Sequence, residues 1–304
     1  MPNRSKKNNE LLLFFSSFHL SLKLFQKNDP LRMAGATAFF TTFALPPIIF
    51  LLTQLFGLFI GNLNMRIRLL ENVSDIIGRE GADQVRDVMR SIRGFGSSWF
   101  VIVIGFIFLF FVATTLFNVI KDSFNQIWKI SVKDKPGFLF MLSIRLRSFA
   151  VILLVGVLFL ANIFLKSLEV LAGNYIDSIW KGGGNYFQSI FSEISSIIIV
   201  AAWFIVLFRY LADGRPGWKA SVLVGLLTGL LFSAGQWLLG ILLINSNISH
   251  IYGASGSLVL ILLFVFYSSF ILYFGACLIA VYSAKKRWLI TPNSKAIIIK
   301  NREE

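Results

Sequence analysis

Apolar residues run along this chain in six long stretches that are separated by shorter polar segments. A helix needs roughly 20 apolar residues to cross about 30 Å of hydrocarbon. The six stretches that reach this length are 33–60, 97–120, 148–171, 188–211, 220–245 and 251–284. This pattern predicts an all-α membrane protein with six transmembrane helices. Pro46 and Pro47 remove backbone donors from the first helix, so we expect a kink or a break there.

Two polar segments also show helical periodicity. Apolar residues at positions 11, 14, 15, 18, 22 and 25, with Lys23 and Lys27 opposite, predict an N-terminal amphipathic surface helix. It should end before Asp29 and Pro30. In the outer loop at 61–96, apolar residues recur at helical spacing among charges of both signs, which predicts two short amphipathic helices. These helices could cap the bundle, rest on the outer leaflet or form a protein interface.

The charges are distributed unevenly about the six predicted spans. The chain has 29 Lys and Arg against 15 Asp and Glu, a net charge of +14. The N-terminal segment, the loops after the second and fourth spans and the C-terminal tail share one side of the membrane, and they hold 21 of the 29 basic residues. The positive-inside bias therefore predicts that both termini lie in the cytoplasm. Nucleic acid is not an expected partner, since no polar domain interleaves basic and stacking aromatic residues.

The expected organisation is a cytoplasmic amphipathic segment (1–28), a six-span membrane domain (29–286) and a basic cytoplasmic tail (287–304). The apolar run at 11–15 is too short for a signal peptide. The lone Cys277 excludes an internal disulfide, and His19 and His250 are too few for a His-rich metal site. We expect no cofactor, no metal and no enzymatic activity.

Polar side chains within the predicted spans are candidates for a transport pathway, because each is costly in lipid unless it is paired or lines a wet path. These candidates are Gln54, Asn118, Glu193, Gln236, Ser268 and Ser269. Glu193 lies near the outer end of its span and can instead reach the interface, while Gln236 can instead form an interhelical hydrogen bond. Ionisable residues do not follow one another through the spans, which disfavours an ion-driven mechanism.

Two further sets of residues follow from the same helices. Basic residues at the cytoplasmic ends could gather into a site for anionic lipid headgroups, or could serve as ordinary snorkelling anchors. They are Lys121, Lys129, Arg145, Arg147 and Arg209. Small residues at four-residue spacing permit close helix packing. They are Gly225, Gly229 and Ser233 on the fifth span and Ala276, Ala280 and Ala284 on the sixth.

Several spaced motifs carry a resemblance to a known family. They are the run LRMAGATAFFTTFALPPIIF at 31–50, NQIWKI at 125–130, FRYLADGRP at 208–216 with Trp218, and YGASGS at 252–257, which continues to Tyr267 and to Gly275 with Ala276. In this order, over residues 29–286, the chain resembles the YihY/BrkB family of bacterial inner-membrane proteins. It departs at Ala212, where a Pro is common, at Cys277, where an acid is usual, and at Phe264, where a Trp is common.

The resemblance implies a function without fixing its chemistry. The family has carried two labels, ribonuclease and envelope biogenesis. A ribonuclease needs metal-holding carboxylates or a His-based acid–base pair in a polar pocket, and neither His has an evident carboxylate partner here. We therefore expect handling or translocation of a lipid or glycolipid of the envelope. The alternatives are a scaffold that recruits partners through the outer loop and, third, an exporter of soluble solutes.

Overall fold

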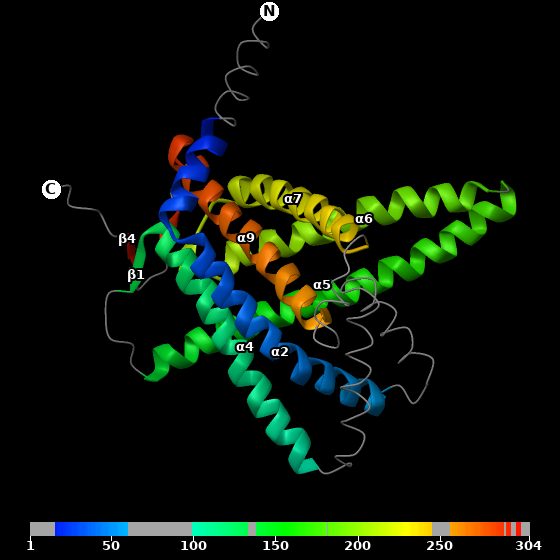
Figure 1. Ribbon diagram of the computed structural model, residues 1–304, viewed down its shortest axis with the longest axis horizontal. Helices are drawn as coiled ribbons and strands as arrows, with labels where there is room; N and C mark the ends of the chain where they lie inside the picture. The colour runs from blue at the N-terminus through cyan, green and yellow to red at the C-terminus, as the bar shows by residue number, and fades with distance from the viewer. Residues whose placement is uncertain are drawn as a thin grey trace, which may run out of the picture. The chain divides into compact units, whose positions relative to one another are not determined.

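A computed structural model of the chain describes residues 16–59, 99–132, 138–180, 182–244, 256–288, 290–292 and 296–298 (Figure 1). The protein is mostly helical. The helices are α2 (Pro30–Phe59), α4 (Trp99–Trp128), α5 (Phe138–Ile179), α6 (Gly183–Tyr210), α7 (Trp218–Ile244) and α9 (Gly256–Lys285). A further helix covers 16–27. Each predicted span thus coincides with one of these helices, and α2 continues through Pro46 and Pro47 without a break.

Three of the described helices are long and apolar enough to cross a membrane. Their candidate segments are Gly183–Tyr210, Trp218–Leu238 and Ile261–Lys285. These belong to α6, α7 and α9 and correspond to the fourth, fifth and sixth predicted spans. The two amphipathic helices predicted within 61–96, the connection around His250 and residues 1–15 lie outside the described residues.

Two helices begin or end far from the predicted positions. α5 has 42 residues, which corresponds to a length of about 63 Å at 1.5 Å per residue, whereas hydropathy predicted 148–171. The reason is that hydropathy marks the apolar part of a helix, and Arg145 and Arg147 are good helix formers that extend α5 beyond it. α6 begins at Gly183 rather than at Gln188. Gly182, just before it, has φ of 86°, a left-handed turn conformation that suits glycine.

The chain divides into two compact units. The first comprises 1–30, 121–234 and 271–304, and the second comprises 31–120 and 235–270. Within the second unit Gly235 of α7 lies against the Tyr267 side chain of α9 so closely that a Cβ would collide with the phenol ring. The buried polar cluster and the cavity described below lie in the first unit.

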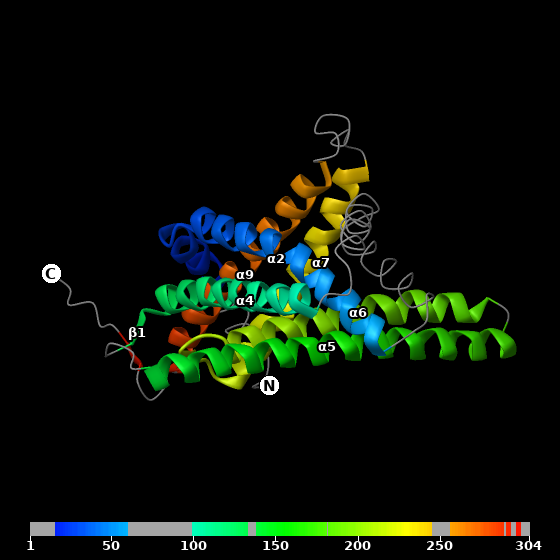
Figure 2. The ribbon, with the colours of Figure 1, turned by 90° about the horizontal axis from the view of Figure 1, so that it is seen from below.

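α5 and α6 form an antiparallel hairpin in the first unit, as Figures 1 and 2 both show. Their connection is tight: the backbone N–H of Gly182 donates to Oδ1 of Asp177 at 2.8 Å. Near it, Gly184 lies directly against the backbone carbonyl of Gly173. Tyr175, Ile179, Trp180 and Tyr186 are exposed around this end of the hairpin.

The core of the first unit forms around Phe124, whose side chain is fully buried. Its ring lies 5.3 Å from that of Trp128, 5.7 Å from that of Phe208 and 6.1 Å from that of Tyr273. α4, α6 and α9 therefore meet through aromatic contacts. α7 packs on α6 through small residues. Gly225 faces Ile205, and a Cβ added at Gly229 would lie 3.0 Å from the backbone of Ala201.

The helix at 16–27 packs on the C-terminal half of α9 within the first unit. Phe18 and Phe25 both lie edge-on to Phe274, with ring centroids 5.1 Å and 5.8 Å away. The helix ends before Asp29, as the sequence predicts, but its most buried residues are Ser17, Ser21 and Phe25 rather than the apolar stripe through Leu22. Small serines allow close approach to a neighbouring helix, which periodicity of apolar residues does not register.

Two short antiparallel β pairings tie the C-terminal segment to the loops. β1 (Ile130–Val132), which follows α4, pairs with β4 (Ala296–Ile298), and β2 (Gly214–Arg215), between α6 and α7, pairs with β3 (Thr291–Pro292). The ends of α4, α6 and α9 and the start of α7 therefore meet at one end of the first unit. The charge pattern assigned the same loops and tail to one side of the membrane.

Candidate functional site

The candidate site lies at this end of the first unit, and the turn between α6 and α7 organises it. The Arg209 guanidinium donates to the carbonyl oxygen of Pro216, and its Cζ lies 5.1 Å from the centroid of the Trp218 indole. Tyr210 also meets Trp218, with ring centroids 6.2 Å apart. Arg209, predicted as a headgroup ligand, thus holds its own turn closed through a hydrogen bond and a cation–π contact.

A buried polar cluster joins this turn to α4. Nδ2 of Asn125 donates to Oδ2 of Asp213 at 2.8 Å, and the backbone N–H of Asp213 donates to Oδ1 of Asn125 at 3.1 Å. Nζ of Lys121 lies 3.9 Å from the same carboxylate. The side chains of Lys121 and Asp213 are only 11% and 9% exposed, so the ion pair is largely shielded from water. Lys121 therefore neutralises a buried acid in the structure.

Asp122 is the exposed neighbour of this cluster. Its carboxylate lies 3.9 Å from Nζ of Lys121. Desolvation raises the pKa of the Asp122 carboxyl, while Lys121 lowers this pKa and Asp213 raises it further. The side chain is 72% exposed, so water screens these effects. We therefore expect Asp122 to contribute little to folding.

Trp128, the last residue of α4, connects α4 to α9. Its Nε1–H donates to the backbone carbonyl of Ala276 at 2.9 Å, and the indole is 6% exposed. The ring also faces Gly214 of the turn, where a Cβ would lie 3.1 Å from the indole and 2.9 Å from Ile290. Gly214 therefore lets the turn approach both side chains.

We expect Trp128→Phe to destabilise the protein by roughly 1 to 2 kcal/mol, because the ring face is kept while the hydrogen bond to Ala276 is lost. Thermal unfolding in mild detergent would measure this as a lower Tm. The matched control is Trp237→Phe, since Trp237 is 70% exposed and should leave the Tm unchanged. Equal Tm values for the two variants would contradict the role of this hydrogen bond.

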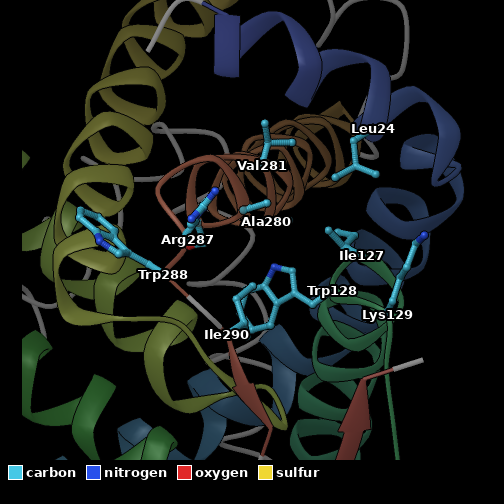
Figure 3. Close-up of a pocket in the computed structure, with 11 residues that line it drawn as sticks. Leu24, Ile127, Trp128, Lys129, Ala280, Val281, Arg287, Trp288 and Ile290 are labelled. Carbon is cyan, nitrogen blue, oxygen red and sulfur yellow. The ribbon is translucent and has the colours of Figure 1, made fainter. Parts of the chain in front are cut away.

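An open, mostly apolar cavity of about 660 Å³ lies beside Trp128 (Figure 3). Its walls come from the N-terminal helix, the end of α4, the last turns of α9 and the segment that follows α9. The lining residues are Leu24, Ile127, Trp128, Lys129, Ala280, Val281, Ser283, Ala284, Arg287, Trp288 and Ile290. Segments distant in sequence therefore build one concave apolar surface.

Two exposed cations, Lys129 and Arg287, lie at this cavity, one residue after the end of α4 and two residues after the end of α9. In the view of Figure 3, Trp128 lies between them. Both have φ of 54°, the left-handed conformation that usually belongs to glycine. The backbone N–H of Lys129 bonds to the Gln126 carbonyl at 3.2 Å, and that of Arg287 to the Ala284 carbonyl at 3.2 Å. Each cation thus occupies the position just beyond a helix end.

The end of α9 forms a complete Schellman motif. Besides the Arg287 bond, the backbone N–H of Trp288 donates to the Ser283 carbonyl at 2.8 Å. The accompanying apolar contact is made by Trp288 and Tyr282, whose ring centroids are 5.7 Å apart. The segment after α9 is therefore held in place at the cavity by backbone bonds as well as by an aromatic contact.

The structure separates the predicted headgroup residues. Lys121 and Arg209 are engaged within the protein, whereas Lys129 is exposed at the cavity. The side chains of Arg145 and Arg147 on α5 lie outside the described residues. Arg287, which the sequence did not single out, joins Lys129 because both follow a helix end.

The predicted polar candidates of the spans belong to both compact units and have different surroundings. Ser268 and Ser269 each donate to a carbonyl of their own helix, Phe264 and Val265 respectively, at 2.7 Å. Asn118 and Glu193 are exposed, Gln236 is half-buried, and the Gln54 side chain lies outside the described residues. A pathway through these positions stays a prediction.

The small-residue stripes have separate surroundings. Gly225 and Gly229 face α6 of the same chain, and Ser233 is half-buried. On α9, Ala276 is buried beneath Trp128, whereas Ala280 and Ala284 line the cavity. Cys277 and Ala212, two of the departures from the family pattern, are fully buried.

The next features are the possible metal ligands and the histidine in the part of the chain that the structure describes. Within it, no group of three His, Cys, Asp or Glu lies close enough to hold a metal ion. His19 is exposed on the helix at 16–27. The chemistry that the described site offers is apolar contact together with positive charge.

Comparison with known proteins places the chain in a family. The family described as "Virulence factor BrkB" matches residues 21–296. Two relatives named UPF0761 membrane protein, from Pseudomonas paraeruginosa (strain DSM 24068 / PA7) and Pseudomonas aeruginosa (strain LESB58), are each 26% identical over 197 residues, which is 64% of this chain and 46% of the relative.

The chain thus spans about half the length of these relatives. No solved structure matches it. The family match includes α4, the turn between α6 and α7, and the whole of α9, so it covers every residue of the polar cluster and the cavity. The chain therefore belongs to the YihY/BrkB family of membrane proteins, as its motifs indicated.

Proposed function

We propose that this chain is a six-span inner-membrane protein with cytoplasmic termini that handles or translocates a lipid-like component of the envelope. The observation that carries the proposal is the open apolar cavity with cations beside it. An apolar cavity binds an apolar group, and cations favour a polar or charged end on the same ligand. A molecule that combines the two is an amphiphile.

Two features support the proposed placement in the membrane. α4 carries exposed Ile104, Ile107 and Phe111, and α6 carries exposed Ile190, Ile194 and Ile198, so both present apolar surface suited to acyl chains. The β pairings join the loops and tail that hold most of the positive charge. These segments would face the cytoplasm by the positive-inside bias, which puts the cavity near the inner leaflet.

The alternative is a scaffold that recruits partners without transport, and one observation favours it. The end of the α5–α6 hairpin exposes Tyr175, Ile179, Trp180 and Tyr186, three of them aromatic. Aromatic residues are enriched both in protein interfaces and at membrane–water boundaries. A scaffold would act through this hairpin end or through the predicted outer loop, and would not need the cavity.

The proposed function predicts that lipid stays with the protein during purification in mild detergent. Mass spectrometry of the retained lipids, compared with an unrelated six-span protein from the same membranes, should show enrichment of one lipid or glycolipid. Ala280→Phe would fill the cavity and should reduce that enrichment to the level of the unrelated protein.

The matched control for this substitution is Ala234→Phe on α7, because Ala234 is exposed and does not line the cavity. It should keep the retained lipid. A wild-type lipid profile equal to that of the unrelated protein would contradict lipid handling, and the scaffold and solute-export functions would then rank first. Enrichment that survives Ala280→Phe would contradict the cavity as the binding site and place the bound lipid elsewhere.

A further inference from the structure

We infer that the cavity selects amphiphiles with a phosphate-bearing anionic headgroup, which Lys129 and Arg287 bind together while the acyl chain lies on the apolar wall. This inference rests on the proposed function and specifies its ligand. It depends on three observations at the cavity: the position of the two cations, a buried hydroxyl and the division of roles among the basic residues.

The first observation is that both cations are unpaired and placed by the backbone. Lys121 pairs with Asp122 and Asp213, whereas neither Lys129 nor Arg287 takes part in an ion pair among the described residues. Both are exposed at the cavity. Both cations border the same cavity, and they come from the ends of two different helices. Two cations on one cavity suit a single anionic group of a ligand.

The second observation is a polar group without a partner in an otherwise apolar wall. Ser283 lines the cavity and is 1% exposed, and its hydroxyl oxygen has no hydrogen-bond partner in the structure. Hydroxyls of Ser within helices usually bond to a carbonyl of the preceding turn, as those of Ser268 and Ser269 do. A hydroxyl that stays unpaired while buried is one that a ligand oxygen could satisfy.

The third observation concerns the ordinary reason for a cation at a helix end. Basic residues complement the negative end of the helix dipole, and for α9 Lys285 in the last turn already does so. Arg287 is therefore additional positive charge. Glycine is the residue that suits the left-handed position best, so a cation there points to a task beyond ending the helix.

The backbone geometry also provides a test that separates binding from folding. Here Lys129→Gly with Arg287→Gly removes both charges and supplies the residue that the left-handed conformation favours. The double variant should unfold at a temperature equal to or above that of the wild type, so a loss of binding would not report a damaged fold.

The experiment uses the full chain in neutral detergent with an equimolar mixture of phosphatidylglycerol and phosphatidylcholine of identical acyl chains. Native mass spectrometry counts each bound lipid. The wild type should prefer phosphatidylglycerol by about tenfold or more, the scale expected for charge-assisted hydrogen bonds, and the double glycine variant should bind both lipids equally. Inorganic phosphate alone should be retained by neither protein.

The matched control removes two other cations from the same end of the unit. Arg215→Gln with Lys219→Gln changes the net charge equally, and both residues are exposed and do not line the cavity. It should keep the preference for phosphatidylglycerol. A preference that persists in the glycine variant, or that disappears in the control, would overturn the inference.

The outcomes also separate this inference from the proposed function. If the wild type retains both lipids without preference, the proposal of lipid handling stands, and the inference of selectivity for an anionic headgroup is overturned. A wild type that retains neither lipid above an unrelated membrane protein contradicts both. Retention of inorganic phosphate by the wild type but not by the glycine variant would show that the ligand is a free anion. It would overturn the inference that the cavity binds an amphiphile.

Discussion

Asp213→Ala should lower the free energy of unfolding by about 3 to 5 kcal/mol, the loss expected when one member of a buried ion pair is removed. The substitution leaves Nζ of Lys121 without its shielded carboxylate and removes the acceptor for Asn125. The Lys121 ammonium and the Asn125 amide would then stay buried without this partner, since the Lys121 side chain is only 11% exposed and Asn125 is buried. Titration with SDS in mixed micelles, followed by tryptophan fluorescence, would measure the effect.

The control for this prediction is the neighbouring acid. Asp122→Ala removes a carboxylate at the same 3.9 Å from Lys121, but one that is 72% exposed, and should change stability little. Asp213→Asn should fall between the two, because it keeps an acceptor for Asn125 and loses only the charge. Similar losses of unfolding free energy for Asp213→Ala and Asp122→Ala would contradict the prediction that burial makes the Asp213 ion pair important for stability.

Gly184→Ala should destabilise the α5–α6 hairpin by about 3 kcal/mol, the upper part of the range for overpacking a close contact. The new Cβ would collide with the backbone carbonyl of Gly173 and lie 2.9 Å from Cβ of Asp177. A backbone atom cannot rotate away as a side chain can, so α5 and α6 must separate. Faster hydrogen exchange in residues 170–190, together with a lower Tm, would report this.

A second Gly→Ala substitution in a helix provides the comparison. Gly35 of α2 has no atom within 4 Å of its ideal Cβ position. Gly35→Ala should therefore be neutral or stabilise the helix by up to roughly 1 kcal/mol, the difference in helix propensity. If both substitutions behaved alike, the close approach of Gly184 to Gly173 would not limit the stability of the hairpin.

The sequence predicted the positions of the helices well, because long apolar runs in this chain end near charged or glycine-rich segments. Each of the six predicted spans coincides with a helix, and three of these helices are apolar and long enough to cross a membrane in the described residues. The ends were predicted less well. Arg145 and Arg147 are polar and yet helical. Hydropathy therefore predicted a start at residue 148, whereas α5 begins at Phe138.

The site was predicted only in part, for a physical reason that differs from residue to residue. Lys129 could be named because it is basic and follows a span. Asp213 could not, because an Asp before a Gly is typical of an ordinary turn, and its partner Asn125 lies far away in sequence. Arg287 required knowledge of the backbone beyond α9, since a left-handed conformation leaves no mark in composition.

The two β pairings have a consequence for the order in which the first unit is made. Two of the described helices separate β3 from its partner β2, and four separate β4 from its partner β1. The ribosome synthesises residues 291–298 after all six helices. Until then, β1 and β2 have no strand to pair with, and the cavity lacks Trp288 and Ile290. The site is therefore completed late, after the helices have been delivered to the membrane, and a chain interrupted before residue 288 would have helices without this cavity.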